Sequence, residues 1–196
     1  MWCEVLKRTV VRGGVRAAAL AAVAGLAMGA AALPAHAVAV ERVAFGDAAP
    51  WLCTPADETD EEAKALDCHK KRALSADFRA RTLHYFVDPP NTAAADAARA
   101  DAVRFYQEAQ AATTAVAAAQ AAAKVAEAAN RITQLAVAKT PEALKQGQDA
   151  AVQTVRSSDA ATKTTPPARD VDANNQADSD EEAAVFLMEA AGWIIG

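Results

Sequence analysis

Large apolar residues first recur near helical spacing in residues 60–86, at Leu66, Leu74, Phe78 and Tyr85. This spacing places them on one face of a helix. Thr59 and Glu62 have the spacing of a capping box at its start. Two prolines follow Asp88, and proline cannot continue a helix. The pattern therefore predicts a helix over residues 60–86.

The next helical segment is rich in alanine. More than half of residues 93–129 are Ala, the best helix former, and residues 93–139 contain no Gly or Pro. Val125, Ala128, Ile132 and Leu135 repeat at coiled-coil-like spacing. We expect one long helix over 93–139, packed as an antiparallel hairpin with residues 60–86. The rest of the long helix then lacks an intrachain partner of equal length.

Three further segments follow. Thr140-Pro141 is a helix start signal and predicts a helix over 141–156. Residues 157–178 are polar and contain Pro, which predicts a disordered linker. Ser179 and three acids predict the start of a C-terminal helix over 179–196. The expected fold is all-α: an elongated Ala-rich helical hairpin with a disulfide-stapled N-terminal arm and a tethered C-terminal helix.

Residues 1–37 have the pattern of a cleavable signal peptide. Four basic residues precede an uncharged run over 17–33, and Ala35-His36-Ala37 ends it with small residues at the cleavage positions. An uncleaved membrane anchor is the alternative, although the run is somewhat short of the ~20 residues that span a bilayer. We expect an exported protein, periplasmic or secreted. The same pattern also directs proteins to a thylakoid lumen.

Two cysteines, Cys53 and Cys68, remain after removal of the signal. Two thiols in an exported protein usually pair, so we predict a Cys53–Cys68 disulfide. One continuous helix would hold them ~22 Å apart at 1.5 Å per residue, whereas a disulfide needs Cα atoms within ~7 Å. The chain must therefore turn back within residues 54–60.

Charge argues against nucleic acid as a partner. The formal net charge is −5, and losing four basic residues and one acidic residue with the signal changes it to −8. Binding to phosphate backbones needs a basic surface. The run Lys70-Lys71-Arg72, with Arg79 and Arg81, is interpreted as a solvated face.

The C-terminal helix is the best candidate for a partner-binding surface. It is the most hydrophobic segment after the signal, and the candidate partner-binding residues are Val185, Phe186, Met188, Trp193 and Ile194. A tethered apolar helix can dock in a groove of a partner or lie on a membrane surface. The alternative is that it folds back and completes the thin core.

No catalytic, cofactor or metal motif is recognisable in the sequence. The paired carboxylates Glu61-Glu62 and Glu181-Glu182 are explained as charge at helix N-termini. Cys53, Cys68, His69 and His84 match no zinc spacing. We therefore expect a non-enzymatic subunit of a larger extracytoplasmic assembly, without cofactor. The alternatives are a membrane-surface protein, or a small enzyme or metal-binding protein that uses His69 and His84.

Overall fold

The computed structural model describes residues 52–54, 57 and 59–193. The predicted signal over 1–37 and residues 38–51 lie outside this part of the chain. The described residues confirm the all-α class, with five α-helices: α3 Glu62–His84, α4 Thr92–Ala111, α5 Ala115–Thr133, α6 Pro141–Thr162 and α7 Val171–Ala190. A short 3-10 helix, η1 Pro89–Asn91, precedes α4.

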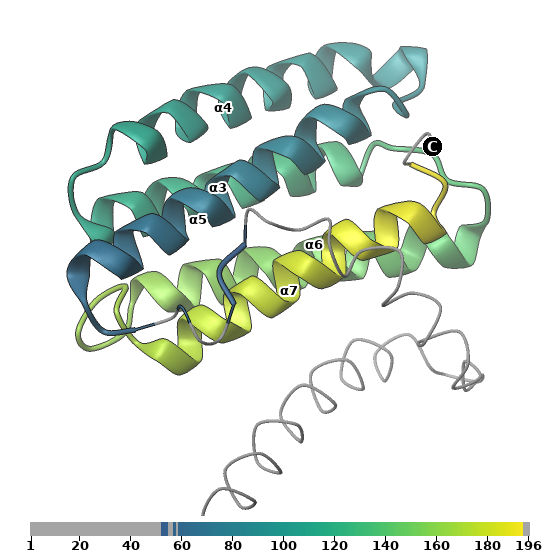
Figure 1. Cartoon of the computed structure of the whole chain (residues 1–196). Helices are drawn as coiled ribbons and strands as arrows, with labels where there is room; N and C mark the ends of the chain where they lie inside the picture. The colour runs from purple at the N-terminus through teal and green to yellow at the C-terminus, as the bar shows by residue number, and fades with distance from the viewer. Residues whose placement is uncertain (1–51, 55–56, 58, 194–196) are drawn as a thin grey trace, which may run out of the picture.

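The helices form three layers. α3 and α5 lie side by side in the middle, α4 covers one side of them, and α6 and α7 cover the other (Figure 1). Most of the buried apolar residues are alanines on facing helix stripes, for example Ala76, Ala102 and Ala122. Small side chains let helices approach closely but bury little area each. The larger apolar side chains that are fully buried are Leu83, Val125, Ile132, Met188 and Trp193.

The predicted single helix over 93–139 is wrong, because the chain turns back between α4 and α5. Ala112 is extended, and the Thr114 side chain caps α5 by accepting a hydrogen bond of 3.2 Å from the backbone N–H of Ala117. The threonine cap satisfies a backbone N–H that would otherwise lack a partner at the start of α5. Folding back also buries the Ala stripe of α4 against α5. The part of the predicted long helix that was expected to lack an intrachain partner is therefore packed against the other part, as α4 on α5.

The predicted linker over 157–178 and the predicted helix start at Ser179 are also wrong. α6 continues to Thr162, and α7 begins at Val171, capped by Asp170 through a 2.8 Å bond from the N–H of Ala173. Several polar residues of this stretch, such as Ser158, Asn174 and Asp178, are buried against other helices. These contacts order the segment although it has few large apolar residues. α7 packs along α6, so the C-terminal helix is not tethered at a distance.

The Cys53–Cys68 disulfide is present, with the two Cα atoms 5.4 Å apart and both side chains buried. The expected turn follows Cys53: the N–H of Asp57 donates to the carbonyl of Thr54 at 2.8 Å. The predicted capping box is absent. Thr59 instead accepts from the N–H of Glu61 at 3.1 Å, and Glu62 accepts from the N–H of Ala115 at 2.6 Å. Glu62 therefore stabilises the start of α5 rather than that of its own helix.

The C-terminal end of α3 meets two other segments. The N–H of Val137 donates to the carbonyl of Phe86 at 2.8 Å, within an isolated antiparallel bridge between Val87 and Ala136. The N–H of Lys139 donates to the carbonyl of Ala191 at 3.2 Å. This end of the bundle thus joins the α3–η1 connection, the α5–α6 connection and the end of α7.

Candidate functional site

The predicted partner-binding residues of the C-terminal helix largely face inward. Val185, Met188 and Trp193 are buried, and Phe186 is half-buried. Ile194 lies outside the described residues. The Trp193 indole N–H donates to the carbonyl of Val137, and its ring lies against Gly147. In this fold the three buried residues complete the core, as the alternative interpretation expected, and do not form an open surface.

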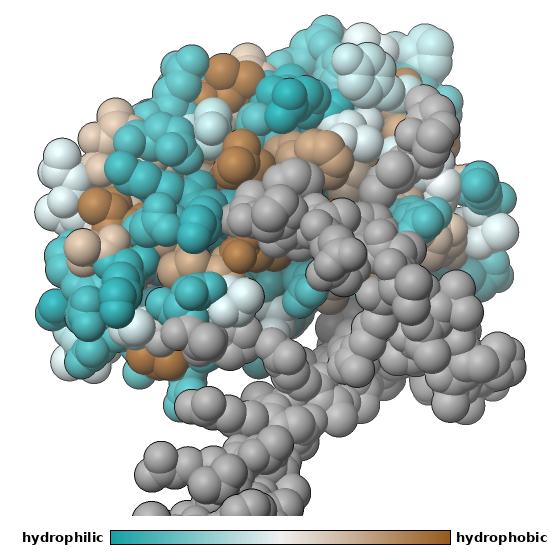
Figure 2. All heavy atoms as spheres, viewed as in Figure 1, coloured by the Kyte–Doolittle hydropathy of each residue, from teal (hydrophilic) through white to brown (hydrophobic). Residues whose placement is uncertain are grey.

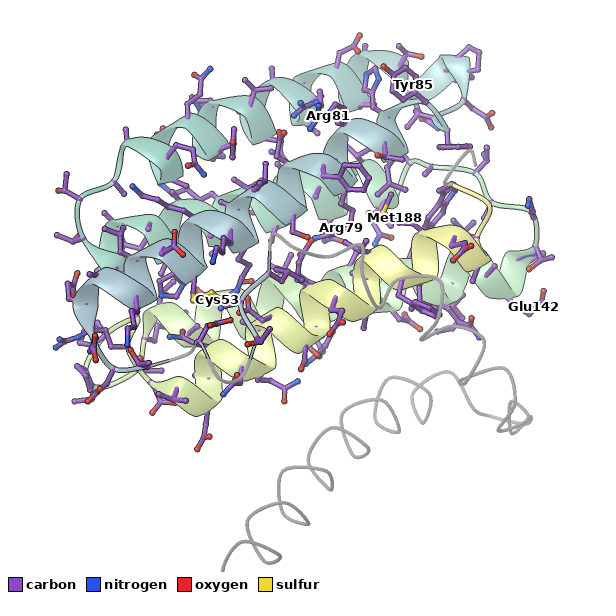
Figure 3. The ribbon with its side chains drawn as sticks, viewed as in Figure 1. Cys53, Arg79, Arg81, Tyr85, Glu142 and Met188 are labelled. Atoms are coloured by element: carbon purple, nitrogen blue, oxygen red, sulfur yellow. A yellow bond between two sulfur atoms is a disulfide. The ribbon has the colours of Figure 1, made fainter. Side chains whose placement is uncertain are left out.

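The large exposed apolar side chains of the described residues lie elsewhere, at the end of α3 and in the α5–α6 connection that meets it. Tyr85 is 78% exposed and Val137 is 44% exposed. A backbone hydrogen bond from Val137 to Phe86 holds Val137 beside the residue that follows Tyr85. We call Tyr85 and Val137, with the half-buried Phe86 and Val87, the apolar tip. Tyr85 lies toward the opposite end of α3 from the disulfide, and it points outward (Figure 3).

Sequence reasoning assigned Tyr85 to the apolar face of its helix, because it continues the spacing of Phe78. It lies instead at the C-cap, where the backbone leaves the helix before the two prolines. A signal existed in the sequence: an aromatic pair, Tyr85-Phe86, stands directly before Asp88-Pro89-Pro90. Residues that follow the last helical turn no longer keep the helical face.

The two histidines of the alternative reading do not form a common site. His69 is fully buried, whereas His84 is at the far end of the same helix and binds the exposed Asp96 at 2.6 Å. Fifteen residues separate them, or ~22 Å of helix at 1.5 Å per residue. No group of three or more metal-ligating side chains occurs among the described residues.

Buried charges fill the contact between α3 and α7. Arg72 Nε donates to Asp178 Oδ1 at 2.6 Å, and Arg79 binds both carboxylate oxygens of Glu181 at 3.1 and 2.9 Å. Ser75 Oγ donates to Glu181 at 3.2 Å. Figure 3 shows Arg79 between the two helices. Arg72 and Arg79 were interpreted as part of a solvated face, and Glu181 as charge at a helix start, and both interpretations are wrong.

His69 belongs to the same contact. Its Nε2 lies 2.7 Å from the carbonyl of Ala168, and its Nδ1 lies 3.1 Å from Arg72 Nη1. A carbonyl only accepts and a guanidinium only donates, so the ring is neutral, with its proton on Nε2. Burial, and then the positive charge of Arg72, lower the pKa of His69 to about 3, against the effect of the Ala168 hydrogen bond. This histidine is a structural hydrogen-bonding group at neutral pH.

The contact is called the polar seam below, and its spacing could have been read from the sequence. His69, Arg72 and Arg79 share one face of α3, and Asn174, Asp178 and Glu181 are spaced by four and three residues on α7. Opposite charges on two helical faces predict pairing. The signal was missed because residues 157–178 were interpreted as linker.

Other surface features offer no convergent chemistry. An open depression of about 370 Å³ between the end of α4 and the start of α5 is lined by four alanines and by Glu108, Gln120 and Lys124. On the face seen in Figure 2, hydrophobic residues appear as separate patches among hydrophilic ones. None of the helices within residues 59–193 is long and apolar enough to cross a membrane.

Comparison with known proteins returns no relative. No family model, no curated protein and no solved structure matches the chain. The class that the structure itself defines is a disulfide-containing helical bundle from an oxidising, extracytoplasmic environment.

Proposed function

We propose that this protein is a non-enzymatic, exported accessory or structural subunit that acts through protein–protein contacts in an extracytoplasmic or membrane-associated assembly. The observation that carries the proposal is the apolar tip. Tyr85 and Val137 are the large hydrophobic side chains left exposed on the described bundle. Tyrosine is enriched at protein interfaces because it combines a large apolar ring with a polar hydroxyl.

The state of the polar residues supports a non-enzymatic role. Buried Ser75 and Glu181 are hydrogen-bonded to each other between α3 and α7, and buried His69 is hydrogen-bonded to the α6–α7 connection. His84 is paired with Asp96 on the surface. Nucleophilic or acid–base chemistry needs such groups to converge where a substrate can reach them. These side chains hold the fold together instead.

The proposed compartment is the periplasm or the extracellular medium, with a thylakoid lumen or retention by an uncleaved N-terminal segment as alternatives. The disulfide supports all of these oxidising locations equally. The membrane-surface alternative relied on the apolar side chains of α7. Since Val185, Met188 and Trp193 are buried, no specific observation now favours it.

Site-specific photo-crosslinking tests the role of the tip. A photo-reactive phenylalanine analogue replaces Tyr85 in the full chain, expressed in its native host and crosslinked in the exported fraction. The matched control places the same group at Lys163, an exposed position next to the α6–α7 turn at the other end of the bundle. We expect one discrete protein adduct from position 85 and none from position 163.

Two results would contradict the proposal. The first is an identical set of adducts from both positions, which shows only random encounter. The second is crosslinking of position 85 to lipid without any protein adduct, which instead supports attachment to a membrane surface. A further variant, Tyr85→Asp, should no longer be recovered in the assembly from the native fraction. Its thermal stability should be unchanged, because the Tyr85 side chain is 78% exposed.

A further inference from the structure

The polar seam differs in kind from the other helix contacts of the bundle. α3, α4 and α5 meet through buried alanines and a few large apolar residues. The first half of α7 meets α3 through charged and polar groups: Arg72, Ser75 and Arg79 opposite Asn174, Asp178 and Glu181. His69 extends this contact to the carbonyl of Ala168, just before α7. Apolar packing of α7 against the main core is found at its other end, at Met188, Ala191 and Trp193.

Separating the seam would expose little apolar surface. Charged groups regain hydration when they separate, and this gain offsets much of their mutual attraction. Separating an apolar contact has no such compensation, since its cost grows with the apolar area exposed. The seam is therefore the helix contact that water can enter at the lowest cost.

Unsatisfied polar atoms add to this difference. Four buried side-chain atoms in the described part of the chain lack a hydrogen-bond partner, and three of them belong to seam residues: Arg79 Nη1, Asn174 Oδ1 and Asp178 Oδ2. A buried polar atom without a partner destabilises the closed state by the hydration it has lost. Opening the seam would return water to all three atoms.

We propose that the polar seam is an opening device: the first half of α7, up to Glu181, unwinds and separates from α3 and α6 while α3, α4 and α5 stay folded. The apolar end of α7 acts as the hinge, held by Met188 and by the hydrogen bond from Trp193 to Val137. The open state presents the side chains of Arg72 and Arg79 along one face of α3. This face is complementary to an acidic helix, since that is what α7 supplies in the closed state.

Native-state hydrogen exchange, followed by mass spectrometry on the full exported chain, tests the device. Amides within 174–182 should exchange through an opening that leaves the amides of α5 protected. Added NaCl should raise exchange in 174–182 before it affects α5. Dissolved ions stabilise the charges exposed in the open state more than the same charges buried as pairs, so salt favours opening. Exchange of both segments at one common rate, at every salt concentration, would overturn the proposal.

A paired substitution makes the test specific to the seam. Arg79→Met with Glu181→Leu replaces the buried ion pair by apolar side chains of similar size. Opening then regains no charge hydration and exposes apolar area instead, so the closed state becomes more favourable. We expect exchange in 174–182 to slow at least tenfold, with α5 unchanged. The matched control removes the exposed pair Lys145–Asp149 of α6 as Lys145→Gln with Asp149→Asn, and should leave both segments as they are.

Unchanged exchange in 174–182 in a folded double variant would refute the device. If the double variant does not fold, the salt dependence of the unmodified chain decides alone, since it needs no substitution.

Discussion

The contact between Trp193 and Gly147 allows a prediction whose sign depends on the background. Gly147 is buried in α6, and a Cβ added there would lie 2.5 and 2.7 Å from two carbons of the Trp193 ring. The ring is 1% exposed, and its N–H donates to the carbonyl of Val137. Gly147→Ala should therefore force the indole away from α6. Overpacking of this kind costs about 1–3 kcal/mol.

An opposing effect comes from helix propensity. Replacing Gly by Ala inside a helix stabilises it by about 1 kcal/mol. In the unmodified chain the two effects leave Gly147→Ala destabilising by roughly 1 kcal/mol. Trp193→Ala alone should cost about 4 kcal/mol, because it leaves a cavity and removes a hydrogen bond. In the Trp193→Ala background the clash is absent, and Gly147→Ala should stabilise by about 1 kcal/mol.

Urea unfolding of the four proteins of this cycle, followed by circular dichroism, measures the coupling. We expect a coupling of about 2 kcal/mol, well above the few tenths typical of residues that do not touch. If Gly147→Ala changed stability equally in both backgrounds, Trp193 would not lie on α6. The conclusion that the C-terminal residues complete the core would then fail.

Three other predictions concern the disulfide and two buried titratable groups. Intact-mass analysis of native material should show Cys53 and Cys68 oxidised, and replacing both by Ser should lower the unfolding free energy by about 3 kcal/mol. The pKa of His69 falls from 6.5 to about 3 on folding, so its contribution to stability is complete above pH 6.5 and declines toward pH 3. In that window the free energy of unfolding from urea titrations should fall by up to about 1.4 kcal/mol for each pH unit, and by less in His69→Gln. Burial raises the pKa of Asp180 despite hydrogen bonds to its carboxylate, so ionisation at neutral pH destabilises the fold; Asp180→Asn should raise the melting temperature at pH 7, and a lower value would show that the charged form is needed.

Local signals in the sequence predicted several elements correctly. The helix beginning at Pro141 follows from a threonine cap and a proline in the first turn, and the Thr140 side chain does accept from the N–H of Ala143 at 3.1 Å. α3 ends within two residues of its predicted end because the backbone before two prolines cannot stay helical. The disulfide follows from the number of cysteines and the compartment. Each of these depends on a few neighbouring residues or on composition.

Features that depend on contacts between distant segments were not predictable in this way. Thr114 can lie inside a helix or cap one, and the packing of α4 on α5 decides between them. Asn174 and Asp178 resemble linker residues until Arg72 binds the Asp178 carboxylate and the backbone carbonyl of Asn174. Glu62 fits a capping box on its own helix, yet it binds the start of α5.

The same distinction applies to the candidate surface. The sequence by itself determined that this is an alanine-rich, disulfide-bonded helical protein with a thin apolar core and one strongly hydrophobic C-terminal segment. Only the tertiary structure decided where that segment lies. A bundle built from alanine lacks bulk, so it buries Met188 and Trp193 as core. Among the residues that the structure describes, the large hydrophobic side chain left most exposed is Tyr85, at the position where α3 ends.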